Sequence, residues 1–146
     1  MMLPSTRGRY AARIMVNLAS RDSPCPATKH EIANSEDMSA DYVEQIMMRL
    51  KAANLVRSHR GRNGGFSLAR PPDAITLADV LQATEGRISP IPCLAYKCSR
   101  APNCPTRPIW KRAAEALEEL FEETTIAQIA KDAALCRATE VLAYEI

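Results

Sequence analysis

The sequence has few of the residue types on which several large classes of protein depend. Its 146 residues include two histidines, five glycines and one tryptophan, and aromatic residues make up only 5%. His30 and His59 suggest no Ser/His/Asp or Cys/His pairing, so we do not expect an enzyme. No apolar run approaches the roughly 18 residues that a membrane span requires. The first residues also lack the apolar core of a signal peptide, so we expect a cytoplasmic protein without a membrane partner.

Positive charge is unevenly distributed along the chain. The net charge is +2, yet residues 1–70 carry 11 Lys or Arg against 6 Asp or Glu, whereas residues 71–146 carry 8 against 11. Residues 49–70 include six basic side chains and no acidic one. A basic run alone is more often a solvated surface, but within a nearly neutral chain it indicates a local site for a polyanion.

Three helices are predicted in the first third of the chain. Ser5 can cap a helix over residues 6–19, Thr28-Lys-His-Glu31 has the capping-box pattern, and Ser39 can cap a helix over residues 40–53. The buried side of the third helix is formed by Val43, Ile46, Met47 and Leu50. Two short helices joined by a tight turn suggest a helix-turn-helix, although most helical hairpins bind no DNA.

A hairpin is predicted directly after the third helix. Residues 54–60 and 66–70 read as strands, and three of the five glycines lie between residues 61 and 65. Asn63-Gly64 favours a primed turn, in which both residues have a positive φ. A helix-turn-helix followed by a basic, glycine-tipped hairpin is typical of a winged helix. We therefore predict a mainly α fold with a winged helix-turn-helix DNA-binding domain.

Candidate DNA contacts lie on the third helix and on the hairpin. Glu44 can accept a hydrogen bond from cytosine N4, and Gln45 can pair with adenine. Ser39 and Tyr42 lie beside them, and Tyr42 can donate to a phosphate, although a helix tyrosine is as often half-buried core. The wing arginines are placed to reach phosphates or a narrow minor groove: Arg57, Arg60 and Arg62.

A cysteine-rich loop is predicted between residues 87 and 108, which hold five of the ten prolines. Cys93-x4-Cys98-x5-Cys104 places three soft thiolate ligands on this loop, which suits an iron–sulfur cluster. Zinc is less favoured, because no tight C-x2-C pair or nearby histidine completes a tetrahedral site. A thiol switch, a zinc-stabilised winged helix and three inert cysteines are the alternatives.

A long amphipathic helix is predicted from about residue 108 to residue 123, with Thr106 as a possible cap. Its apolar stripe includes Trp110, Leu117 and Phe121. The helix could fold back on its own domain, but DNA-reading helices normally act in pairs on two half-sites, so we favour a dimer helix. The expected organisation is a DNA-binding domain over residues 1–86, a sensor loop over 87–107, and a dimerisation helix with its tail over 108–146.

Several segments together resemble a known family. They are Ser5–Ala11, Ser39–Ile46, Leu55–Gly61 with Gly64-Gly65-Phe66, Ile75–Val80, and the cysteine loop running into Pro108-Ile-Trp110. The chain resembles the bacterial winged-helix regulators that include the iron–sulfur cluster regulator IscR, the nitric-oxide sensor NsrR, the iron regulator RirA and the cysteine-metabolism repressor CymR. The resemblance covers about residues 3–123.

The resemblance implies a homodimer that binds double-stranded promoter DNA, represses or sometimes activates transcription, and senses iron–sulfur, redox or nitric-oxide status. Its cofactor would be a 2Fe–2S or 4Fe–4S cluster, with Cys93, Cys98 and Cys104 as metal ligands. In the cluster regulator, a histidine three residues after the third cysteine is the fourth ligand, and Arg107 stands at that place here. The alternative on the same fold is a clusterless repressor that responds to thiol redox state or cysteine metabolism.

Overall fold

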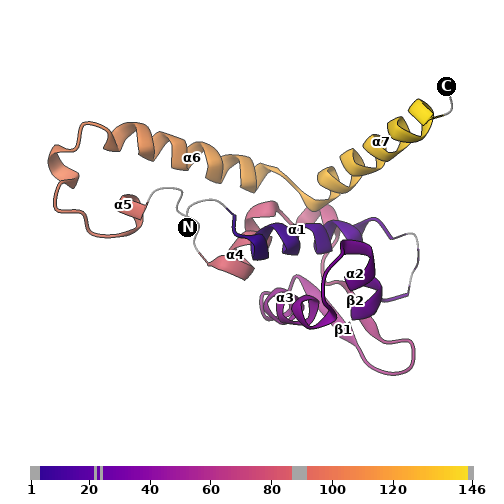
Figure 1. Cartoon of the computed structure of the whole chain (residues 1–146). Helices are drawn as coiled ribbons and strands as arrows, with labels where there is room; N and C mark the ends of the chain where they lie inside the picture. The colour runs from indigo at the N-terminus through magenta and orange to yellow at the C-terminus, as the bar shows by residue number, and fades with distance from the viewer. Residues whose placement is uncertain (1–3, 22, 24, 87–91, 145–146) are drawn as a thin grey trace.

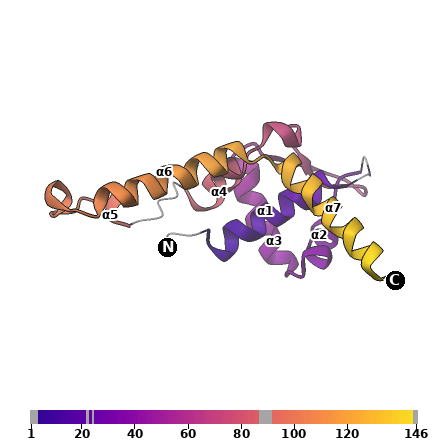
Figure 2. The ribbon, with the colours of Figure 1, turned by 90° about the horizontal axis from the view of Figure 1, so that it is seen from above.

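The structure is a computed structural model that describes residues 4–21, 23, 25–86 and 92–144. Its elements are α1 (Thr6–Ala19), α2 (Lys29–Glu36), α3 (Ala40–Ala52), β1 (Val56–His59), β2 (Gly65–Leu68), a 3-10 turn (Pro72–Ala74), α4 (Leu77–Glu85), α5 (Pro92–Ala95), a second 3-10 turn (Ala101–Asn103), α6 (Arg107–Glu123) and α7 (Ile126–Tyr144). α1–α4 and the strands form a body, from which α6 extends to one side and α7 to the other (Figures 1 and 2).

The first three helices begin at the expected caps. The Thr28 hydroxyl accepts from the Glu31 N–H at 3.2 Å, while the Glu31 carboxylate accepts from the Thr28 N–H at 2.7 Å, which completes the capping box before α2. The Ser39 hydroxyl accepts from the Tyr42 N–H at 3.2 Å before α3. Asp37, with φ 54°, ends α2 in the left-handed region and sets up the tight turn into α3. The helix-turn-helix prediction is confirmed at this level.

The start of α1 is tied to the end of α4. The Ser5 N–H and hydroxyl both donate to Glu85 Oε1 at 2.8 Å. Gly8 makes room for this carboxylate, because a Cβ at that position would overlap with Glu85 Oε1. The first turn of α1 therefore fixes the point at which the chain leaves α4.

The hydrophobic core lies between α1, α2, α3, α4 and the base of the hairpin. Its fully buried large side chains are Ile14, Met15, Ile32, Val43, Ile46, Met47, Leu50, Leu55, Ile75, Val80, Leu81 and Ile126. Ile126 begins α7, and its N–H donates to the Ile75 carbonyl at 2.9 Å. Ile129, one turn further along α7, is partly buried against the same core.

The wing is an antiparallel pair in which Val56 faces Leu68 and His59 faces Gly65. The predicted primed turn is wrong, because neither Asn63 nor Gly64 has a positive φ. Gly61, with φ 103°, makes the reversal instead, and the Gly64 N–H donates to its carbonyl at 3.0 Å. The loop is therefore longer than a two-residue turn.

We call residues 92–123 the arm. None of the residues of α6 is buried, and the exposed fractions of Ile109, Trp110 and Leu120 are 52%, 42% and 56%. α6 meets the body at α4 and runs away from it (Figure 1). Thr106 makes no side-chain capping bond, which corrects the expected cap. Within the described residues, no helix is long and apolar enough to cross a membrane.

Candidate nucleic-acid interface and cysteine loop

The outer face of α3 is exposed because the opposite face is committed to the core. Glu44 and Gln45 lie on this outer face, as predicted for base-reading side chains. Ser39 is exposed, but its hydroxyl caps α3. Tyr42 is half-buried and packs edge-on against Tyr10, with ring centroids 5.9 Å apart. Of the four candidate residues on this helix, Glu44 and Gln45 are therefore the ones whose side chains are available to a groove.

An ion pair joins the outer face of α3 to the start of α2. Lys29 Nζ lies 2.7 Å from Glu44 Oε2, with Lys29 partly exposed and Glu44 exposed to solvent. The hydrogen bond and charge of Lys29 lower the pKa of Glu44, and the same contact raises the pKa of Lys29. Both groups are therefore charged at neutral pH. The sequence analysis missed Lys29, because the two residues are 15 positions apart and only the fold brings them together.

Met48 is a second residue that the sequence analysis missed. It follows Glu44 by one helical turn, and 67% of its surface is exposed. A solvent-exposed methionine on a polar helix face is suited to contact a thymine methyl group in a major groove. The sequence could have indicated this exposure, because position 48 falls outside the helical spacing of the apolar residues that form the core.

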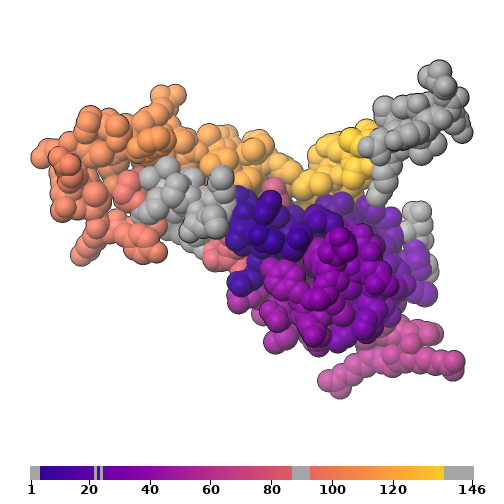
Figure 3. Space-filling model, in the orientation of Figure 1, coloured from indigo at the N-terminus to yellow at the C-terminus, as the bar shows by residue number. Residues whose placement is uncertain are grey.

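The wing carries its arginines into solvent. Arg57, Arg60 and Arg62 are all exposed, and the wing projects from the body as the pink extension in Figure 3. His59 Nε2 and Ser67 Oγ are 2.8 Å apart across the strands. α3 and the wing lie on one side of the body, away from α6 and α7 (Figure 1). The fold thus places the acidic and amide groups of α3 beside a basic hairpin.

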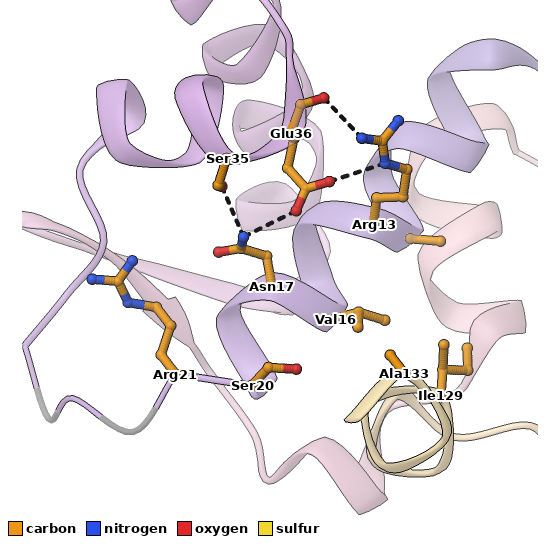
Figure 4. A pocket seen from close by; sticks show the side chains of 10 residues that line it. Arg13, Val16, Asn17, Ser20, Arg21, Ser35, Glu36, Ile129 and Ala133 are labelled. Atoms are coloured by element: carbon orange, nitrogen blue, oxygen red, sulfur yellow. Dashed lines mark hydrogen bonds and ion pairs between the residues drawn. The ribbon is translucent and has the colours of Figure 1, made fainter. Parts of the chain in front are cut away.

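A hollow of about 660 Å³ lies between α1, α2 and α7 (Figure 4). Its polar groups bond to one another. Arg13 Nε donates to Glu36 Oε2 at 2.9 Å, and Asn17 Nδ2 donates to Glu36 Oε1 at 2.9 Å. Figure 4 shows Arg21 turned away from Ile129 on α7. These contacts hold α1 to the end of α2, and we assign the hollow no ligand.

The cysteine loop lies at the far end of the arm. Cys93, on α5, Cys98 and Cys104 are free thiols and are each partly exposed. Arg107 Nη1 donates to the Cys93 carbonyl at 3.0 Å, which ties the beginning of the loop to the start of α6. Hydrogen bonds from the hydroxyl and N–H of Thr106, with a smaller effect of Arg107, lower the pKa of the Cys104 thiol.

The donor chemistry of this loop fits an iron–sulfur cluster. Three thiols share one segment, lie outside the core and form no disulfide. Across the described residues, however, no three Cys, His, Asp or Glu side chains lie close enough together to hold a metal ion. Ligation by Cys93, Cys98 and Cys104 would therefore require the loop to fold around the cluster.

Comparison with known proteins identifies the family to which the chain belongs. Residues 4–132 match Rrf2, described as an iron-dependent transcriptional regulator. The chain belongs to the Rrf2 family. The transcriptional regulator CymR of Bacillus subtilis is 37% identical over 126 residues, which are 86% of this chain and 88% of CymR. The protein rrf2 of Nitratidesulfovibrio vulgaris is 33% identical, over 90% of this chain and 89% of that protein.

Solved Rrf2-family structures show the same fold. The structure of CymR, titled the global cysteine regulator of B. subtilis, has a TM-score of 0.78 at 37% identity and covers 90% of this chain and 98% of CymR. IscR of T. potens has a TM-score of 0.73 at 32% identity, covering 88% of this chain and 86% of IscR. The winged-helix prediction is confirmed, and this Rrf2-family protein is a DNA-binding transcriptional regulator, not an enzyme.

Proposed function

We propose that this Rrf2-family chain is a homodimeric repressor whose affinity for promoter DNA follows the state of an iron–sulfur cluster on the arm. The observation that carries the proposal is the group of three free thiols outside the core, at the far end of a helix that buries none of its own residues. The parts are the DNA-binding domain over 1–86, the sensor loop over 87–107, and the dimerisation helix and tail over 108–146.

DNA is read by α3 and held by the wing. Gln45 and Glu44 face the major groove, with Glu44 accepting from cytosine N4. Ser39 fixes the start of α3 through its capping bond to the Tyr42 N–H. The wing contacts phosphates or the minor groove through three exposed arginines, Arg57, Arg60 and Arg62.

The dimer forms through the arm. Trp110 and Leu120 are large apolar side chains that the same chain leaves exposed, and Leu117 and Phe121 are only partly covered. A second copy of α6 packed against this stripe would remove that surface from water, which favours association. Two copies also supply two α3 helices, as recognition of a two-fold DNA site requires.

Cys93, Cys98 and Cys104 would hold the cluster. When bound, the cluster supplies a centre that reacts with oxygen or nitric oxide. The residues of this chain then set the order of the loop between α4 and α6. Arg107 is not a metal ligand, and it stands where the related cluster regulator has histidine, so the fourth ligand would come from outside the loop's cysteines.

Anaerobic purification tests the cluster directly. Iron and sulfide counts and an absorption spectrum should show a cluster in the wild-type protein, and Cys93→Ala, Cys98→Ala and Cys104→Ala should each lose it. Cys136→Ala is the matched control, because that exposed cysteine lies on α7 and should leave the iron content unchanged. If the wild type holds no iron after anaerobic reconstitution, or if all three loop variants retain it, the cluster proposal fails.

A clusterless thiol switch is the second candidate, and the local chemistry of Cys104 favours it. The lowered pKa of this thiol leaves more thiolate, the form that is oxidised, at neutral pH. The Arg107 contact with Cys93 also orders the loop without a metal. Under this function, peroxide would change promoter affinity in iron-free protein, and Cys104→Ser would abolish that response while Cys25→Ser would not.

A further inference from the structure

The first half of α3 presents negative charge on the face that is to approach DNA. Asp41 and Glu44 are both exposed, one turn apart, on the side of the helix opposite the core. DNA phosphates repel an uncompensated carboxylate, so this face requires a nearby cation if Glu44 is to reach a base. The basic residues of α3 itself, Arg49 and Lys51, lie in its last turn instead.

Lys29 supplies that cation from another helix. It is the first residue of α2, and its Nζ lies 2.7 Å from Glu44 Oε2. The charge of Asp41 also raises the pKa of Lys29, with a smaller effect than that of Glu44. Lys51, by contrast, donates to Ser58 Oγ at 2.6 Å and faces the wing. Among the ion pairs of the described residues, Lys29–Glu44 is the one that joins α2 to α3.

We propose that Lys29 is a positioning residue that determines sequence specificity, by entering the DNA interface as a neutral pair with Glu44. The pair acts in both directions. Lys29 neutralises and orients the Glu44 carboxylate so that it can accept from a base, and Glu44 keeps the Lys29 ammonium away from the phosphates. This inference rests on the proposed role of α3 as the reading helix.

The pair therefore exchanges non-specific affinity for specificity. A free lysine at the start of α2 would contact a phosphate on any duplex, and one such contact steepens the slope of log affinity against log salt by about 0.9. Between 50 and 200 mM salt, that difference corresponds to about a three- to fourfold change in affinity. While Lys29 is bound to Glu44, this sequence-independent contribution is suppressed.

Salt titration of full-length protein tests the release of Lys29. The probe is a duplex pool of random sequence, measured with wild type, Glu44→Gln, Lys29→Met and the double variant. We expect Glu44→Gln to bind the pool more tightly, with a slope steeper by about 0.9, and the double variant to return to the wild-type slope. If the double variant has the same steeper slope as Glu44→Gln, the inference is overturned. It is also overturned if Glu44→Gln has the wild-type slope.

Selection from a random library tests the orientation of Glu44, which a merely structural pair would not affect. We expect Lys29→Met to weaken the same cytosine preference that Glu44→Ala removes, and Lys29→Arg to retain it. Lys111→Met is the matched control, because it breaks an exposed Lys111–Glu115 pair on α6, away from α3. An unchanged consensus for Lys29→Met would overturn the proposal.

Different results would overturn the ion-pair inference and the proposed reading role of α3. If Lys29→Met matches wild type in both slope and consensus while Glu44→Ala still loses the cytosine preference, only the ion-pair inference is wrong. If the wild-type protein selects no sequence from the library, the proposed reading role of α3 and the inference that rests on it both fail.

Discussion

The body and the arm differ in where they place their apolar side chains. In the body, Ile14, Ile46 and Leu50 have no exposed surface, and every helix from α1 to α4 contributes to one core. In the arm, α6 buries none of its residues, and Trp110 and Leu120 face outwards. The body therefore has a closed hydrophobic interior, whereas the arm leaves its apolar stripe accessible to solvent.

The same contrast separates the chemistry of the two regions. Several charged groups in the body form ion pairs that join its elements, as in the Arg13–Glu36 and Lys29–Glu44 contacts. The arm holds three free thiols and a guanidinium that bonds to a backbone carbonyl. The buried core concentrates stability in the body, and the proposed function assigns association and signal response to the arm.

Reversing the polarity of the arm should have the largest effect. Trp110→Glu combined with Leu117→Glu would place two unpaired charges in the proposed interface, at a cost of several kcal/mol. We expect a monomer by analytical ultracentrifugation, with helical content retained by circular dichroism. Glu118→Gln, on the exposed surface of the same helix, should remain dimeric. A stable dimer in the double variant would show that another surface holds the copies together.

Truncating one apolar side chain in each region should separate core from interface. Ile46→Ala removes a fully buried side chain, and we expect it to lower the free energy of unfolding by about 2–5 kcal/mol at any protein concentration. Leu120→Ala should lower stability by an amount that depends on protein concentration, because it weakens association rather than the core. Equal, concentration-independent losses in urea denaturation would refute the distinction.

Helix caps offer a smaller test of the same contrast. Thr28→Ala removes the capping box of α2 and should cost about 1 kcal/mol. Thr106→Ala removes a residue that makes no side-chain cap on α6 and should cost little. Hydrogen bonds from the backbone N–H and the side chain of Thr28 lower the pKa of Glu31. The capping box therefore contributes its full stabilisation above the usual pKa of a Glu side chain. This stabilisation is lost as the pH falls through the lowered pKa of Glu31.

Removal of a single arginine charge should have the smallest effect, and this effect should differ between the wing and α6. Arg60→Ala should flatten the slope of log affinity against log salt by about 0.9, since one phosphate contact is lost. Arg112→Ala, an equally basic change on α6, should leave the slope unchanged. The measurement is fluorescence anisotropy with a labelled duplex at several salt concentrations. Identical slopes for wild type and Arg60→Ala would remove this arginine from the DNA surface.

Much of the body could be predicted from the sequence because its signals are local. The cap at Ser5, the box at Thr28 and the apolar spacing of α3 each act within a few residues, and the structure places those helices as expected. The primed turn predicted at Asn63-Gly64 was wrong, because the loop is longer and Gly61 has the positive φ instead. The burial of Ile126 in the core was also not predicted, because its hydrogen-bond partner Ile75 is distant in sequence.

The candidate site could be predicted only in part, for the same reason. Glu44 and Gln45 follow from their position on an amphipathic helix, whereas Lys29 depends on how α2 crosses α3. The spacing of Cys93, Cys98 and Cys104 indicates soft ligands. It does not determine how the loop folds, because proline-rich segments have no periodic pattern that specifies a conformation.

The attachment of α6 to the body has a mechanical consequence. At the C-terminal end of the helix, the Leu77 N–H donates to the Thr124 carbonyl at 2.8 Å and the Ile126 N–H donates to Ile75. The 17 residues of α6 span about 25 Å from that pivot to the cysteine loop. A shift of about 2 Å at the loop thus corresponds to a rotation of only about 5° at the pivot. Through this lever, a change at the loop would reach α4, which packs against both α6 and α3.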